Sequence, residues 1–241
     1  MPVRPYMREM NRYLRKVDYC QYSFVASDGS VQRFPYQKPT AIWTNLKGWD
    51  VRTCKCEGRR HASPLIGDAA RGSRGDFRQG QTPSRNFKHQ VPDELHATLL
   101  QSAMRASPSA TWVLDMYCGT QSLKRSCERL GIKYVGCDIL PHVKTLRNGK
   151  YHYAYTDIVG DLHGADVGKL IRRAAKLIGE SASDILLVWA SPPCDTFSCA
   201  NALCPKDKRC RDFSDPTRPP LNEQARSDDQ MVEALVQQLL H

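Results

Sequence analysis

Short apolar runs alternate with stretches of helical spacing from Val91 to the end of the chain. The apolar runs predict strands at residues 112–115, 134–137 and 185–189, with a shorter extended piece that reaches Asp157. Apolar positions three or four residues apart predict helices from Pro92 onward and at 123–130, 167–178 and 227–240. The run at 185–189 is continuous and branched, which is typical of a buried parallel strand. Strands alternating with helices predict an α/β fold, a doubly wound sheet that binds its ligand at the carboxyl ends of the strands.

The first sixty residues carry weaker signals and are expected to be partly irregular. Residues 8–17 can form a short helix with Met10, Leu14 and Val17 on one face. Asp28-Gly29 predicts a hairpin turn between two short β-prone runs. The runs are 22–25 and 31–34, and a further short strand is expected at 41–44.

Composition divides the chain into three parts. Residues 61–88 are rich in Gly, Arg, Ser and Gln and predict a flexible linker. It separates a small basic segment at 1–60 from a core at 89–241. The formal net charge is +10, and residues 1–90 hold all of this excess, with 17 Lys and Arg against 7 Asp and Glu. This asymmetry indicates a polyanionic partner with salt-dependent binding, and a soluble basic tail without a partner is the alternative.

Nothing in the sequence predicts a membrane protein or a secreted one. No apolar stretch approaches the ~20 residues that span a bilayer, and the first residues lack the apolar core of a signal peptide. We therefore expect a soluble intracellular protein, with nucleus and cytoplasm not distinguished, whose ten cysteines are reduced thiols.

Two groups of residues could supply metal ligands. They are Cys54 and Cys56 with His61, and Cys199 with Cys204 and Cys210. Neither spacing matches the usual paired Cys-x-x-Cys knuckles, so the interpretation is incidental thiols and no metal.

A loop with candidate chemistry follows the first core strand. It runs from Asp115 to Ser122, and Gly119 within it allows the backbone to approach a cofactor. Asp138, at the end of the second strand, is placed to accept hydrogen bonds from ribose hydroxyls. A merely structural turn is the alternative for this loop.

The second loop follows the apolar run and contains Ser191-Pro192-Pro193-Cys194. Two prolines make the approach rigid and hold Cys194 at the end of the strand, towards the cofactor crevice. A nucleophilic thiol needs such placement and an environment that favours the thiolate. The alternative is a buried structural cysteine in a proline-rich turn.

These two loops resemble motifs of the DNA cytosine-5 methyltransferases. Residues 191–198 are similar to the catalytic motif Pro-Pro-Cys-Gln-x-Phe-Ser, with Asp195 at the Gln position, and residues 115–122 to the first motif, Asp-Leu-Phe-x-Gly-x-Gly-Gly. Gln121 and Ser122 replace the glycine pair, a variant that looks like the form in some algal and viral members. The resemblance implies a Rossmann-like S-adenosylmethionine-dependent methyltransferase fold with a basic, partly irregular N-terminal segment.

It also implies roles for individual residues. Cys194 would attack the base, Tyr117 would lie against S-adenosyl-L-methionine, Asp138 would bind its ribose, and Asp157 and Ile158 would flank its adenine. The residues assigned to the cofactor in this way are Asp115, Tyr117, Gly119, Thr120, Gln121, Ser122, Asp138, Ile139, Asp157, Ile158 and Pro193.

The motifs stand in a permuted order, and one of them is absent. Residues 18–22 and 38–45 resemble a block that normally follows the catalytic core, with Ala41 where relatives often have Arg. Residues 90–95 resemble the family's last motif, with His89 in place of Asn. The Glu-Asn-Pro/Val motif, whose glutamate holds the cytosine ring, does not occur in the sequence. A second chain or a missing segment would have to supply it.

The sequence therefore predicts a cytosine carbon-5 methyltransferase, or a partial or degenerate member of that family, that acts on DNA after base flipping. One alternative is an RNA cytosine-5 methyltransferase with the same Pro-Cys motif. The other is a catalytically inactive protein that binds nucleic acid and keeps the fold.

Overall fold

The computed structural model describes residues 11–25, 29–34, 39–56, 91–147, 150–192 and 220–240. Its centre is a parallel sheet with strand order β10-β5-β6-β9. The four strands are β5 (Trp112–Met116), β6 (Lys133–Asp138), β9 (Ile158–Val159) and β10 (Ile185–Ala190). The predicted α/β class is confirmed, and this strand order with helical crossovers is compatible with a Rossmann-like fold.

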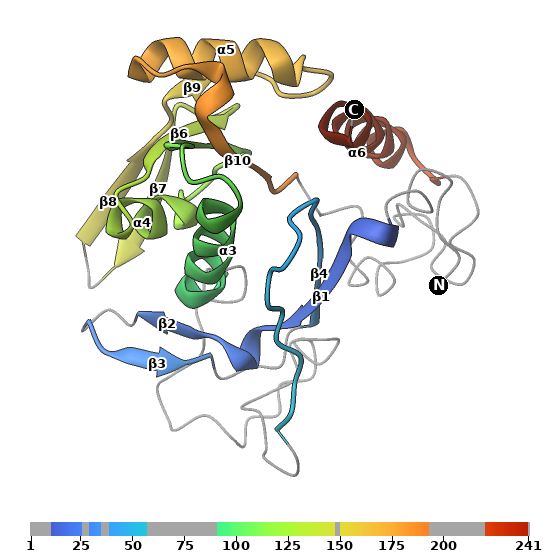
Figure 1. Cartoon of the computed structure of the whole chain (residues 1–241). Helices are drawn as coiled ribbons and strands as arrows, with labels where there is room; N and C mark the ends of the chain where they lie inside the picture. Colours follow the sequence, from blue (N-terminus) through green and yellow to red (C-terminus); the bar gives the residue numbers. More distant parts are fainter. Residues whose placement is uncertain are drawn as a thin grey trace.

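Helices cover both faces of this sheet (Figure 1). They are α3 (Asp93–Ala106), α4 (Ser122–Arg129), α5 (Val167–Ile178) and α6 (Glu223–Leu240). Alternate residues of β5 face opposite layers: Leu114 packs with α5 and α6, whereas Val113 packs with α3 and α4. None of the described helices is long and apolar enough to cross a membrane.

The helix boundaries follow local signals in the sequence. Asp166 caps α5 by accepting a hydrogen bond from the backbone N–H of Lys169, and Gly179 ends the helix in the left-handed conformation. Pro92 stands at the start of α3, as predicted.

The N-terminal residues form two small antiparallel pairs of strands that pack on α3. One pair is β1 (Leu14–Asp18) with β4 (Pro39–Trp43), and the other is β2 (Ser23–Val25) with β3 (Val31–Arg33). Short 3-10 turns precede β1 at Asn11–Tyr13 and follow it at Tyr19–Gln21. Their apolar side chains share one buried cluster with Leu95 and Leu99 of α3. Asp93 and Glu94 anchor this segment: Asp93 accepts from the N–H of Val25, and Glu94 accepts from Ser23 and Arg52.

One prediction of secondary structure is wrong, and two others are correct only in part. The helix expected at 8–17 is wrong in its described part, because residues 14–18 pair with β4 and alternate between the exposed Lys16 and the buried Val17. The extended piece before Asp157 is an antiparallel hairpin, β7 (His142–Arg147) and β8 (Lys150–Tyr155). The apolar strand β10 is parallel, as expected, but only half-buried, because it is the outermost strand of the described sheet.

Candidate functional site

The loop between β5 and α4 is built on left-handed backbone conformations. Tyr117, Gly119 and Gln121 have φ values of 61°, 46° and 55°. Asp138, at the carboxyl end of β6, holds this loop: its Oδ2 accepts a hydrogen bond from the backbone N–H of Gly119 at 2.9 Å. Its Oδ1 accepts from the N–H of Leu140 at 3.2 Å. The Asp138 side chain therefore fixes the loop and remains half-exposed at the strand end where a ribose is expected.

Gly136 of β6 lies directly beneath the loop. A Cβ atom at this position would lie 3.0 Å from both Cys118 Sγ and Tyr134 Oη, and 3.2 Å from Gln121 Nε2. The absence of a side chain thus lets the loop pack against the strand. The N–H of Gly136 also donates to Asp157 Oδ2 at 2.7 Å, which ties the residue just before β9 to the same position.

Asp115 supports the loop from inside the protein. Its side chain is buried, and the hydroxyl of Tyr134 donates to Asp115 Oδ2 at 2.8 Å. Burial raises the pKa of Asp115 to about 7, and the nearby Asp138 adds to the rise although the Tyr134 hydrogen bond opposes it. Asp115 therefore does not offer its carboxyl group to a ligand at the surface.

Two side chains of the loop point to neighbouring segments. Gln121 is buried and donates to the carbonyl oxygen of Tyr155 at 2.6 Å, while the Tyr117 hydroxyl donates to the carbonyl oxygen of Leu162 at 3.4 Å. Thr120 and Ser122 are exposed, at the start of α4. The outer surface of the loop thus consists of small polar side chains, which can contact a bound molecule.

The residues expected around an adenine differ in accessibility. Ile158 is only 2% exposed and packs in the core of the sheet, so its side chain is enclosed by protein. Ile139 and Val159, at the carboxyl ends of β6 and β9, are 61% and 45% exposed. Exposed aliphatic side chains beside Asp138 provide an apolar surface for a flat ring next to the acceptor for a ribose.

The described residues also form a hollow of about 400 Å³ against α5. Asp157, Ile158, Arg173, Lys176 and Leu177 line it. Asp157 and Ile158 are the two residues that the resemblance places beside the adenine. None of the five residues belongs to the loop after β5, where the ribose is expected.

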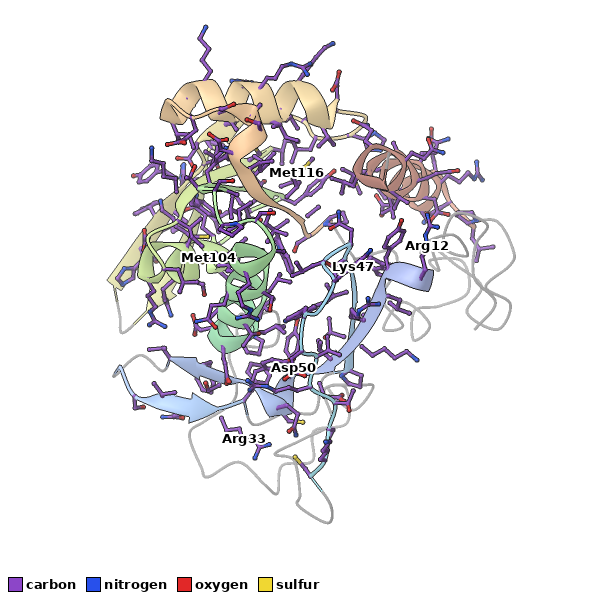
Figure 2. The ribbon with its side chains drawn as sticks, in the orientation of Figure 1. Arg12, Arg33, Lys47, Asp50, Met104 and Met116 are labelled. Atoms are coloured by element: carbon purple, nitrogen blue, oxygen red, sulfur yellow. The ribbon has the colours of Figure 1, made fainter. Side chains whose placement is uncertain are left out.

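The carboxyl end of β10 lies beside the loop after β5. The N–H of Ser191 donates to the carbonyl oxygen of Met116 at 3.2 Å, and the Trp189 indole donates to Ser191 Oγ at 2.8 Å. Met116 itself is buried below α5 (Figure 2). The chain leaves β5 towards β6 on one side and returns to β10 on the other, so this is the point where the strand order reverses. Pro193 and Cys194 lie outside the described residues.

Comparison with protein-family models, with curated proteins and with solved structures found no match for this chain.

Buried thiols surround the loop but are poor nucleophiles. Burial raises the pKa of Cys118, Cys127 and Cys137 to about 12 in each case, and the nearby Asp115 adds to the rise. These three thiols stay protonated at neutral pH. They are therefore not candidates for a thiolate-dependent reaction.

Sequence reasoning missed several residues that shape the site. Gly136 and Tyr134 were assigned only to a strand. The loop of the first motif (residues 115–122, the motif loop) nevertheless packs against both residues. Glycine in the middle of a strand was the available signal, because it often marks a close approach of another segment. Nothing in the local sequence indicates that Tyr134 pairs with Asp115, since only the parallel register of β5 and β6 brings the two together.

Proposed function

We propose that this chain is the cofactor-binding and nucleophile-bearing core of an S-adenosylmethionine-dependent cytosine-5 methyltransferase that acts on DNA. One observation carries the proposal: the strand that precedes the Pro-Pro-Cys sequence ends at the sheet's reversal point, with Ser191 bonded to Met116. Ligands of open α/β sheets bind at this point. Cys194, two residues beyond Pro192, would follow the same edge of the sheet as the motif loop. This position suits methyl transfer from a cofactor bound at the loop to a base bound beside it.

The residues at this edge fit S-adenosylmethionine in chemistry. Asp138 supplies a charged acceptor for ribose hydroxyls, Ile139 and Val159 supply apolar surface, and the N-terminus of α4 follows the exposed Thr120. S-adenosylmethionine, when bound, supplies an activated methyl group. The protein's part is to hold the molecule beside the loop and to bring Cys194 to the base.

The proposed reaction begins at Cys194. Its thiolate sulfur would form a bond to carbon 6 of a flipped cytosine, which places electron density on carbon 5. Carbon 5 would then take the methyl group, while the bond from that group to the cofactor's sulfonium sulfur breaks and S-adenosylhomocysteine is left. A base then removes the proton from carbon 5, the bond between carbon 6 and sulfur breaks, and the Cys194 thiolate is regenerated. A carboxyl group that holds the cytosine ring is needed for efficient attack, and the chain lacks the family's Glu motif.

The outer edge of β10 suggests where that carboxyl group would enter. All six residues of β10 are half-buried, and no described strand pairs with its outer edge. A further parallel strand added there would place its own carboxyl end next to Ser191. We propose this edge as the position of a Glu-bearing segment from a second chain or from sequence beyond this chain.

Binding of S-adenosylhomocysteine, measured by calorimetry, tests the cofactor site. We expect saturable binding by the full chain. Asp138→Ala should weaken the binding about tenfold to a hundredfold. This loss of affinity corresponds to the free energy of hydrogen bonds to a charged group. Asp138→Asn should weaken it less, because an amide oxygen can still accept one bond from the loop. Glu233→Gln, an exposed change on α6, is the matched control. Folded protein that gives no heat at millimolar ligand would contradict the proposed cofactor.

Two features of the surface support nucleic acid as the partner. Exposed basic side chains are spread along the N-terminal segment, as Arg12, Lys47 and Arg33 show in Figure 2. Tyr151, Tyr153 and Tyr155 alternate along β8 and are 61%, 46% and 66% exposed on one face of the hairpin. Lys144 of β7 lies 3.6 Å from the ring centre of Tyr151. Exposed rings beside a cation are a surface on which unstacked bases can stack.

Salt dependence of binding to a cytosine-containing duplex tests the role of the basic segment. Deleting this segment would uncover Leu95 and Leu99, so charge removal is the better test. We expect the triple change Arg12→Ala, Lys16→Ala and Lys47→Ala to weaken binding at low salt. The slope of log K against log salt should become shallower by about 0.9 for each phosphate that the variant no longer neutralises. Removing three charges from α5 (Lys169→Ala, Arg172→Ala, Lys176→Ala) should change the slope less. Equal slopes for the two triple variants would contradict a role for the N-terminal segment.

A further inference from the structure

Three cysteine thiols meet in the N-terminal segment, outside the loop after β5. Cys20 lies in the 3-10 turn Tyr19–Gln21, and Cys54 and Cys56 lie in the stretch after Val51. Their Sγ atoms all lie within 4.8 Å of one another. The sequence grouped Cys54 and Cys56 with His61, which lies outside the described residues, and favoured incidental thiols. In the fold, Cys20 joins the pair from 34 residues upstream of Cys54.

Hydrogen bonds hold the two segments that carry these thiols in place. The N–H of Asp18 donates to the carbonyl oxygen of Arg52 at 3.0 Å, and the N–H of Cys54 donates to Asp18 Oδ2 at 2.7 Å. The N–H of Arg52 donates to the Tyr22 hydroxyl at 2.9 Å. Hydrogen bonds within the protein therefore bring together the two segments that carry the three thiols.

The surroundings of Cys56 Sγ suit a thiolate, whereas burial raises the pKa of the Cys20 thiol to about 12. Gln21 Nε2 donates to Cys56 Sγ at 3.2 Å and to Cys20 Sγ at 3.6 Å. Arg33 Nη2 lies 3.9 Å from Cys56 Sγ and supplies a positive charge. Donors and a cation directed at sulfur stabilise its negative form, and such outer contacts are typical of metal-bound cysteines.

From this arrangement we infer that Cys20, Cys54 and Cys56 form a binding site for a thiophilic divalent cation, namely Zn²⁺. Sulfur ligands ~2.3 Å from a tetrahedral zinc ion lie ~3.8 Å from one another, so small side-chain rotations from the observed spacing suffice. Zinc binding releases the thiol protons, and water or another donor completes the tetrahedron. The ion would fasten the turn Tyr19–Gln21 to the stretch that carries Arg52, which in turn is paired with Glu94 of α3. The inference is independent of the methyltransferase proposal.

Titration of the reduced, metal-free full chain with Co²⁺ tests the site. We expect sulfur-to-cobalt charge-transfer bands and the visible absorption of a tetrahedral ion, saturating at about one ion per chain. Added Zn²⁺ should displace the cobalt spectrum and raise the thermal midpoint of unfolding by several degrees. A cobalt spectrum without thiolate bands would overturn the assignment of the ligands.

Variants assign the ligands individually. Cys20→Ser, Cys54→Ser and Cys56→Ser should each lower the affinity at least ~100-fold, and Gln21→Ala about tenfold, the effect of losing an outer contact. Cys127→Ser, a change of a buried thiol in α4, should leave the spectrum and the affinity unchanged. Thiolate-bound cobalt that persists in the triple Ser variant would overturn the proposal.

Alkylation of the chain without substitutions tests the same site, so its result does not depend on whether the serine variants fold. Zn²⁺ should slow iodoacetamide labelling of Cys54 and Cys56 together, as read by peptide mass. Labelling rates that do not respond to Zn²⁺, or a Cys54–Cys56 disulfide that persists under reducing conditions, would also overturn the metal site.

Discussion

Cys194→Ser should abolish every covalent complex between this chain and DNA that contains 5-fluorocytosine. A serine hydroxyl is a far poorer nucleophile than a thiolate at neutral pH, so the bond to carbon 6 should not form. Fluorine at carbon 5 prevents the final proton removal, so a thioether made by Cys194 should survive a denaturing gel. Peptide mass after digestion would identify the cysteine that carries the base.

The amount of trapped DNA tests separately whether the absent glutamate carboxyl group is needed for the attack by Cys194. The chain by itself should trap little DNA, because it lacks the family's Glu motif. Addition of a polypeptide that carries a Glu-Asn-Pro/Val strand should increase trapping if the edge of β10 accepts it. Cys118→Ser and Cys127→Ser should have no effect, since burial raises the pKa of both thiols to about 12. A complex formed by the Cys194→Ser chain would show that another residue is the nucleophile.

Asp115→Asn should make the protein more stable than the original at pH 8 and equally stable near pH 4. Burial raises the pKa of Asp115 from 3.8 to about 7, with a further contribution from Asp138. The folded state therefore keeps its proton between these pH values while the unfolded state loses it. The stability that protonation provides is present below about pH 4 and is lost as the pH rises to about 7. A difference of three pKa units corresponds to roughly 4 kcal/mol in the free energy of unfolding.

Urea denaturation at several pH values measures this effect. The asparagine variant should lack the decline in the free energy of unfolding between pH 4 and 7, and it can still accept the Tyr134 hydrogen bond. Tyr134→Phe removes the hydrogen bond that lowers the Asp115 pKa, so the decline should extend to higher pH. Parallel curves for the original chain and Asp115→Asn would show that Asp115 is ionised in the folded state across this range.

Local signals in the sequence sufficed for most of the core. The spacing of α5 and its closing Gly179, the apolar strands β5 and β10, and the placement of Asp138 at a strand end all depend on residues close together in the chain. The hairpin turn at Gly29 is of the same kind, because a glycine with positive φ sits between two β-prone runs. The motif loop could be located in this way, since it follows directly from one strand and precedes one helix.

Local signals of this kind could not predict which distant segments pair with each other. Residues 14–18 have helical spacing, but their partner β4 holds them in a strand. Tyrosines alternate along β8, but its partner β7 shows no regular alternation of apolar and polar positions, so the sequence did not reveal that the two strands pair. Parallel pairing of β5 with β6 likewise decided that Asp115 is enclosed beside Tyr134, although its motif suggested a residue at the cofactor.

The sequence by itself therefore determined the alternation of strands and helices, the position of the loop after β5 and the basic character of the N-terminal segment. Those properties arise from neighbouring residues and from composition. Only the tertiary structure decided that β10 is the outermost strand among the described residues, that Gly136 supports the motif loop and that Cys20 joins Cys54 and Cys56. Each of these depends on contacts across tens of residues, where burial and hydrogen bonding in the folded chain select one arrangement among many that local preference allows.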